Sequence, residues 1–156
     1  MTDEKKPLTR SELEIIIKRR AAVLLIILAA LVAVNSFFKD GNSSRIMKDI
    51  IAANNQWAWY QAKNVRSVIY ETANRPVDAE RMKADMEQIK YVATALEAEQ
   101  KALSAKAPYY TYSAMLMQLG LVLSTAAILA VSMPLFYAAV AVGSSGVLLF
   151  AIALGV

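Results

Sequence analysis

Apolar residues along the chain gather in two regions that are separated by a long polar stretch. The first region is 21–38, and the second begins at residue 113 and contains no charged side chain. A membrane span needs about 20 apolar residues, so the first region predicts one transmembrane helix and the second is long enough for two. Proline disfavours helix in its neighbourhood, so Ser132-Met133-Pro134 predicts a division into helices over 113–133 and 135–154.

The same pattern leaves two alternatives open. The basic Lys18-Arg19-Arg20 before the first apolar run would also suit a cleaved signal peptide. Acidic residues in the preceding segment, and the lack of a clean small-x-small site after the run, favour a retained anchor. The second apolar region would also suit one kinked, tilted helix with a re-entrant end. We expect two helices joined by a tight turn at the membrane surface.

The polar stretch, residues 39–112, predicts an antiparallel two-helix hairpin outside the membrane. Ser43 and Ser44 can cap a helix over 45–73. Asn74-Arg75-Pro76-Val77 then breaks the helix, and Asp78 can cap a second one over 78–106. We therefore predict an all-α membrane protein with three transmembrane helices and a coiled-coil-like hairpin between the first and the second.

Heptad spacing predicts which faces of the two hairpin helices meet. In the second helix the spacing selects Met82, Ile89, Leu96 and Leu103, with Met86, Val92 and Ala93 beside them. In the first helix it selects Met47, Asn54, Gln61 and Val68. Polar seam residues reduce stability and fix register or oligomeric state, which is the role expected of Asn54, Gln61 and Asn64. The alternative is that these three face a wet edge of the hairpin.

Aromatic and basic side chains in the first hairpin helix predict a docking surface. Trp57 and Trp59 are two positions apart, so they project from nearly opposite helix faces and one seam cannot bury both. Trp59 shares a stripe with Lys63, Arg66 and Tyr70 that would suit an anionic or aromatic partner. The alternative is a solvated face with local cation–π pairs. The predicted contact residues are Trp57, Trp59, Tyr60, Lys63, Arg66 and Tyr70.

Composition argues for a membrane protein and against most catalytic chemistry. Hydrophobic residues make up 57% of the chain and the mean hydropathy is +0.38, which is high for a soluble domain. The absence of Cys and His disfavours zinc, haem and iron–sulfur sites and rules out thiol and histidine catalysis. The sequence also lacks a P-loop and a nucleophile elbow. We predict no catalytic residue, no cofactor and no metal site, and hence no enzyme.

Charge predicts the orientation in the membrane. The tail of residues 1–20 is rich in Lys and Arg, and the positive-inside rule places it in the cytoplasm. The hairpin and the C-terminus then lie on the outer, periplasmic side of what we expect to be a bacterial inner membrane. Lys18, Arg19 and Arg20 would meet anionic lipid head groups. Ser11 and Glu14 form a candidate capping box for a helix entering the membrane. The net charge of +4 fits this topology better than nucleic-acid binding.

Polar and small residues inside the apolar regions predict contacts between helices. Small residues four apart let helix backbones approach closely, and isolated amides and hydroxyls can hydrogen-bond between helices. The predicted contact residues are Gln118, Gly120, Ser124, Ala139 and Gly143. No Asp, Glu, Lys, Arg or His lies within either apolar region, which disfavours a proton or ion carrier.

One stretch resembles a known family. Asn55-Gln56-Trp57-Ala58-Trp59-Tyr60-Gln61-Ala62-Lys63-Asn64, continuing to Ile69-Tyr70-Glu71, resembles the small bacterial membrane proteins grouped as domain of unknown function 4337. The layout is also similar, with one N-terminal span, a helical middle and a C-terminal apolar pair. The resemblance implies an architecture but no activity, so it supplies no catalytic residue.

These features together predict a non-enzymatic membrane scaffold or accessory subunit. It would self-associate or dock onto a larger membrane complex through its spans and hairpin. Its expected partners are membrane lipids and either further copies of the chain or the subunits of that complex, and not nucleic acid. The alternative is a small oligomeric channel or transporter, in which the pore would be lined by Gln118, Ser124, Thr125 and Ser144.

Overall fold

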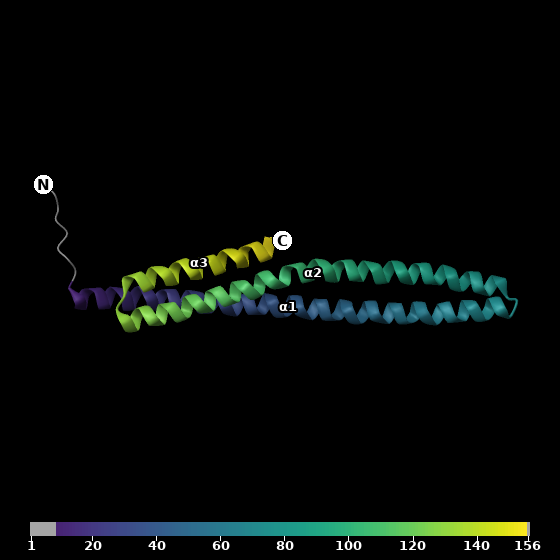
Figure 1. Ribbon diagram of the computed structural model, residues 1–156, viewed down its shortest axis with the longest axis horizontal. Helices are drawn as coiled ribbons and strands as arrows, with labels where there is room; N and C mark the ends of the chain where they lie inside the picture. The colour runs from purple at the N-terminus through teal and green to yellow at the C-terminus, as the bar shows by residue number, and fades with distance from the viewer. Residues whose placement is uncertain (1–8, 156) are drawn as a thin grey trace. The chain divides into compact units, whose positions relative to one another are not determined.

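A computed structural model describes residues 9–155, and these form three helices and no strand (Figure 1). Helix α1 spans Arg10–Thr72, α2 spans Pro76–Ala130 and α3 spans Met133–Gly155. Each helix is long and apolar enough to cross a membrane. The all-α class and the three candidate spans are therefore confirmed. Residues 1–8 of the predicted basic tail lie outside the described residues.

The first two helices are longer than predicted because two expected interruptions do not occur. Helix α1 continues through Gly41, Ser43 and Ser44, so neither serine caps a helix and the predicted segments 21–38 and 45–73 belong to one helix. Helix α2 likewise continues through Pro108. Helix propensity is a weak guide, because glycine costs about 1 kcal/mol and proline about 3 kcal/mol in a helix interior and tertiary contacts, such as the hydrogen bond from Asn42 to Leu103, can outweigh such costs. The expected limits of the polar stretch thus fall inside helices.

The first two helices also begin at residues other than the predicted caps. The main-chain N–H and Oγ1 of Thr9 donate to the Glu12 carboxylate at 2.9 and 2.8 Å, and these bonds lower the pKa of Glu12. This cap lies two residues before the predicted Ser11–Glu14 box. Helix α2 begins at Pro76, because proline suits the first helical position, where no N–H is needed. Asp78 pairs with the Arg75 guanidinium at 2.6 Å.

Both turns between helices use a left-handed residue. Asn74, after α1, has φ 53°, a conformation that asparagine tolerates well, and the following Arg75 N–H donates to the Tyr70 carbonyl at 2.8 Å. Val131, after α2, has φ 47° and is strained there because its side chain is β-branched. This second turn adjoins the predicted Ser132-Met133-Pro134 break.

The chain divides into two compact units. Unit 1 combines the residues up to Asp40 with those from Ala107 onward, and unit 2 is Gly41–Lys106. Unit 1 contains parts of all three helices, with α3 beside the first part of α1 and the last part of α2 (Figure 1). Its core consists of one cluster around Ala21, Ala127 and Phe136 and a second around Tyr110, Phe150 and Ala153.

Candidate functional site

In unit 2, the second half of α1 and the first half of α2 contact each other in opposite directions. The Asn42 side-chain amide donates to the Leu103 carbonyl at 3.0 Å near one end, and Lys83 pairs with Glu71 at 2.8 Å near the other. Residue numbers therefore rise along α1 as they fall along α2. Hydrogen bonds and ion pairs between the two helices thus accompany the apolar residues of this seam.

The residues of α1 that face inward in unit 2 recur every three or four positions. This inner stripe, buried or half-buried throughout, consists of Asn42, Ile46, Asp49, Ala53, Gln56, Tyr60, Lys63, Ser67 and Tyr70. The predicted seam of Met47, Asn54, Gln61 and Val68 is shifted by one position and is exposed, so the predicted register of α1 is wrong. In the observed register Asn42 and Lys63 find partners on α2, while Asn54 and Gln61 stay accessible.

The predicted seam of α2 does face α1. Met82, Met86 and Ile89 are buried or half-buried, and so are Ala93, Leu96 and Leu103. Only Val92 of the predicted set is exposed. Apolar residues dominate this stripe, so hydrophobic spacing alone identifies it.

Three of the four predicted aromatic docking residues have partners within unit 2. Trp57 is half-buried, its ring lies 5.6 Å from that of Tyr60, and its Nε1 donates to the Glu97 carboxylate at 2.7 Å. The Arg75 guanidinium lies 4.9 Å from the centre of the Tyr70 ring, a cation–π contact within the chain. Trp57, Tyr60 and Tyr70 therefore contact other residues of unit 2 and present little free surface, and the hydrogen bond from Trp57 to Glu97 joins α1 to α2.

Trp59 is the aromatic residue of this cluster that projects from unit 2, with 66% of its surface exposed. One hollow beside it, of about 390 Å³, is lined by Gln56, Trp59, Lys63, Asp85, Gln88, Ile89 and Val92. A second hollow, of about 340 Å³, is lined by Ala58, Trp59, Ala62, Lys63 and Arg66. We call these two hollows with the indole between them the Trp59 surface. A protruding aromatic ring flanked by hollows suits an interlocking contact with another molecule.

The charges on the Trp59 surface are partly neutralised. Lys63 Nζ lies 2.6 Å from a carboxylate oxygen of Asp85, and its hydrogen bond lowers the pKa of Asp85. Arg66 makes no ion pair within residues 9–155. Of the predicted stripe, the structure thus brings Trp59, Lys63 and Arg66 to one surface and leaves Tyr70 out of it.

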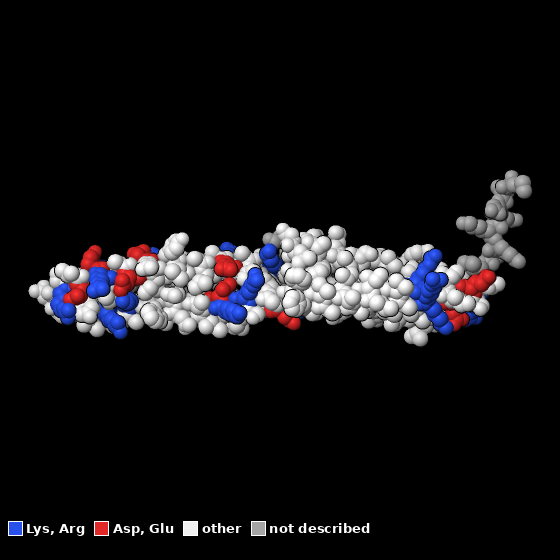
Figure 2. Space-filling view, turned by 180° about the vertical axis from the view of Figure 1, so that it is seen from behind, with Lys and Arg blue, Asp and Glu red and all other residues white. Residues whose placement is uncertain are grey.

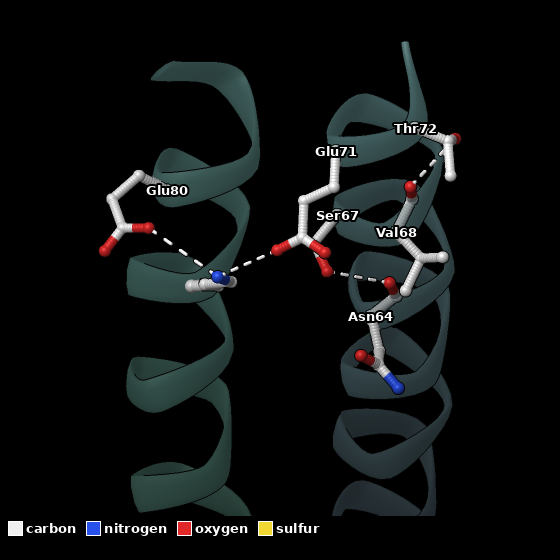
Figure 3. A network of polar contacts seen from close by, with 7 residues as sticks. Asn64, Ser67, Val68, Glu71, Thr72 and Glu80 are labelled. Carbon is white, nitrogen blue, oxygen red and sulfur yellow. Dashed lines mark hydrogen bonds and ion pairs between the residues drawn. The ribbon is translucent and has the colours of Figure 1, made fainter. Parts of the chain in front are cut away.

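A second ionic cluster ties the ends of α1 and α2 in unit 2 (Figure 3). Lys83 lies 2.8 Å from Glu71 and 3.8 Å from Glu80, and Glu71 is the main cause of its raised pKa. Nearby, Ser67 Oγ donates to the Asn64 carbonyl at 2.8 Å. The Asn64 side chain is exposed and lies off the seam, unlike the prediction. No group of three acidic residues spaced to hold a metal occurs within residues 9–155.

In unit 1, the predicted small residues lie where helices approach most closely. A Cβ atom added to Gly120 would come within 3.0 Å of the Gly143 Cα, and one added to Gly143 would come within 3.0 Å of Leu28. Ala139 and Ser124 are fully buried, and Ser124 Oγ donates to the Gly120 carbonyl at 2.8 Å. Such approach gives tight van der Waals contact in a setting where lipid removes the hydrophobic advantage.

The four residues predicted to line a pore differ in exposure. Gln118, Thr125 and Ser144 are exposed, whereas Ser124 is buried. Thr125 Oγ1 donates to the Val122 carbonyl of its own helix at 2.7 Å. Gln118 is thus the one predicted intramembrane contact residue that lies outside the helix contacts of unit 1.

The sequence analysis missed the contact between Ser113 and Gly146 in unit 1. A Cβ atom on Gly146 would lie 2.8 Å from the Met117 nitrogen, and Ser113 Oγ donates to the Gly146 carbonyl at 2.9 Å. Asn35, with none of its surface exposed, donates through Nδ2 to the Tyr110 carbonyl at 3.0 Å. Helical spacing could have identified Gly146 as a contact residue, because it follows Gly143 by three positions and so lies on the same face of α3.

The basic residues before the first span divide into two kinds. Lys18 pairs with Glu14 one turn away, and this hydrogen bond lowers the pKa of Glu14. Arg19 and Arg20 make no ion pair within residues 9–155 and line a groove of unit 1. Figure 2 shows a band of Lys and Arg beside a surface free of charged side chains.

A family model described as a domain of unknown function (DUF4337) matches residues 17–80 and 72–156. The two matches together cover nearly the whole chain, including both units and all three helices. No curated protein and no solved structure matches the chain.

Proposed function

This chain belongs to the DUF4337 family, and we propose that it is a non-enzymatic integral membrane scaffold or accessory subunit. It self-associates or docks onto a larger membrane complex through its spans and through unit 2, which projects from the membrane as a two-helix hairpin. The basic tail lies in the cytoplasm by the positive-inside rule, with the hairpin and the C-terminus on the outer side of a bacterial inner membrane.

The observation that carries this proposal is a second heptad on α1 in unit 2. This outer stripe consists of Met47, Ile51, Asn54, Ala58, Gln61, Val65 and Val68, all of them exposed. At 3.6 residues per turn, the inner and outer stripes lie roughly 150° apart around the helix. Helix α2 covers the inner stripe, so the outer stripe is free to pack against another helix.

Most of the large apolar side chains of unit 2 are not buried within it. Met86 is the only large one among its buried apolar residues, which otherwise are alanines. The inner stripe also carries a buried carboxylate oxygen of Asp49 that accepts no hydrogen bond within the described residues. Met47, Ile51, Val65 and Val68 are each more than half exposed. Covering these side chains with another helix would stabilise the assembly by about 25 cal/mol for each Å² of apolar surface removed from water.

The chemistry of the outer stripe favours another copy of the same chain as its cover. Copies inserted in one membrane with one topology place their α1 helices parallel, so Asn54 meets Asn54 and Gln61 meets Gln61. An amide both donates and accepts hydrogen bonds, so it can pair with the same amide of another copy. A layer of paired amides in a helical interface fixes the register and the number of copies. The α1 segment from Ile50 to Ala62 carries no charge, so identical copies meet there without repulsion.

Oxidative cross-linking tests this proposal directly, because the chain has no cysteine. Ala58→Cys places a thiol on the outer stripe, and Ala98→Cys places one on an exposed position of α2 as the matched control. In a parallel pair the two Ala58 positions come close enough for a disulfide. We expect a covalent dimer from Ala58→Cys in native membranes and little from Ala98→Cys. Equal yields from both variants would remove the outer stripe as the contact.

A small oligomeric channel is the second candidate, and one feature favours it. Gln118 and Thr125 are seven positions apart and exposed on the same face of α2 in unit 1. Ion flux through vesicles containing only this protein, reduced by Gln118→Leu, would support the channel. Absence of flux from vesicles with correctly inserted protein would contradict the channel and favour the scaffold.

A further inference from the structure

Unit 1 contains a groove between the beginning of α1 and α3, with a volume of about 540 Å³. Arg19 and Arg20 line it together with apolar side chains. The apolar lining is Ile16, Val23, Leu24, Ile27, Phe136 and Val140. The groove therefore combines two cations with an apolar wall, which is the chemistry that suits an amphiphile with an anionic head.

The two arginines are available for a ligand. Neither makes an ion pair within residues 9–155, whereas the neighbouring Lys18 is paired with Glu14. A guanidinium presents a planar fork of donors that matches phosphate oxygens, often in bidentate geometry. Both residues directly precede the apolar run 21–38, the depth at which lipid phosphates lie.

The apolar wall accounts for the rest of the ligand. Val23 and Ile27 are one turn apart on α1 and about half exposed, and Phe136 and Val140 are one turn apart on α3. These residues continue the groove along both helices away from the arginines, as an acyl chain would run. A soluble phosphate has no apolar part that could contact this wall. A zwitterionic lipid would place its own cation near the guanidinium groups, which would repel it.

We propose that this groove binds one anionic phospholipid. Arg19 and Arg20 hold the phosphate, and an acyl chain lies along Val23, Ile27 and Val140. The bound lipid bridges α1 and α3 at the cytoplasmic side of the membrane. This site involves unit 1 alone and does not depend on how unit 2 assembles, so it goes beyond the scaffold role.

Lipid titration of the full chain in detergent, followed by native mass spectrometry, tests the site. The probes are phosphatidylglycerol, phosphatidylcholine with the same acyl chains, and inorganic phosphate. We expect one tightly held phosphatidylglycerol per chain and weaker binding of both other probes. An accessible ion pair contributes up to about a fivefold factor, so Arg19→Gln/Arg20→Gln should weaken phosphatidylglycerol binding up to about 25-fold. The charge-matched control, Lys90→Gln/Lys101→Gln in unit 2, should leave binding unchanged.

A second variant separates the groove from general surface charge. Val23→Trp keeps both arginines but fills the groove, so it should also displace the lipid, and it carries the test if the double variant fails to fold. Unchanged phosphatidylglycerol binding by Val23→Trp would overturn the proposal, since the arginines would then act as surface charge alone. Equal affinity for phosphatidylcholine, or for inorganic phosphate, would overturn it as well.

Discussion

Unit 1 brings its helices closest together at residues that have little or no side chain, whereas unit 2 joins its helices through side chains that carry amides and charges. In unit 1 the closest approaches occur at Gly120, Gly143 and Gly146, where an added Cβ would meet a neighbouring helix at 2.8 to 3.0 Å. In unit 2 the helices are joined by long side chains such as Lys63 and Trp57. The two units contain consecutive parts of the same two helices, so the difference lies in the side chains.

This contrast teaches how each unit gains stability. In lipid, apolar burial gives no advantage, so close backbone packing and buried hydrogen bonds hold helices together. Unit 1 follows that rule, with Asn35 and Ser113 bonded to carbonyls of neighbouring helices. In water, the same contacts would be weak and apolar burial would dominate. Unit 2 buries little apolar surface by itself, which is why we expect its outer stripe to need a partner.

Glycine substitution gives the largest expected effect and the sharpest contrast between the units. Gly146→Ala places a Cβ against the Met117 main chain, which cannot yield easily, so we expect a loss of about 2 to 3 kcal/mol in unfolding free energy. Gly41→Ala meets nothing within 4 Å in the middle of α1, so the better helix former should add about 0.5 to 1 kcal/mol. Reversible denaturation in detergent, followed by circular dichroism, measures both. Equal effects of the two substitutions would contradict the close packing in unit 1.

Removing the exposed indole of unit 2 should affect assembly more than folding. Trp59→Ala is expected to weaken association by about 2 kcal/mol, or roughly 30-fold, as expected for a protruding aromatic at a contact. The melting temperature should change little because the ring is mostly exposed. Tyr91→Ala removes another exposed aromatic of unit 2 and serves as the control. An unchanged native mass and partner set, with a lower melting temperature, would assign Trp59 to the fold.

The smallest expected effect is a pH dependence confined to unit 2. The hydrogen bond from Lys63 lowers the pKa of Asp85, so this pair stabilises unit 2 at pH values above 3.8, the ordinary pKa of the carboxyl group. Its contribution is lost as the pH falls through the lower pKa of the folded state. The pKa of Lys83 is raised by Glu71, so that contribution is present below 10.5 and is lost at still higher pH. Both groups are exposed, so the changes should be small.

Comparing the wild-type chain with Asp85→Asn isolates the acidic limb. We expect the melting temperature of the variant to fall less on acidification than that of the wild type. The Lys83→Gln variant should likewise lose the alkaline limb while keeping the acidic one. Parallel curves for variant and wild type would show that the Lys63–Asp85 pair does not stabilise unit 2 in solution.

Hydrophobic spacing predicted the spans and the α2 seam because apolar residues alone define them. It failed on α1 because that helix carries two competing stripes in unit 2. The more apolar stripe, with Ile51 and Val65, is exposed, while the inward stripe contains Asp49 and Lys63. Choosing between the two required knowing which side chains find partners on α2, and this depends on tertiary contacts. The continuity of α1 and α2 was missed because Ser43 and Ser44 were interpreted as a helix cap and the second hairpin helix was ended at residue 106, although both helices continue through these positions.

Parts of the candidate surface were predictable for a similar reason. The opposite projection of Trp57 and Trp59 follows from helix geometry alone, and the structure places one half-buried and the other exposed. The pairing of Lys63 with Asp85 was not predictable, because it depends on the register between α1 and α2. That pairing leaves Arg66 as the cation of the Trp59 surface without an ion pair among the described residues.

The native mass of the full chain, extracted gently from its membrane, tests the central claim most directly. We expect more than one copy, or one copy with a fixed companion protein, for the wild-type chain. We also expect Ile51→Lys/Val65→Lys, which places charges on the outer stripe, to reduce the number of copies while the helix content stays the same. A wild-type chain that leaves the membrane as a single copy without a companion would contradict the proposed scaffold role.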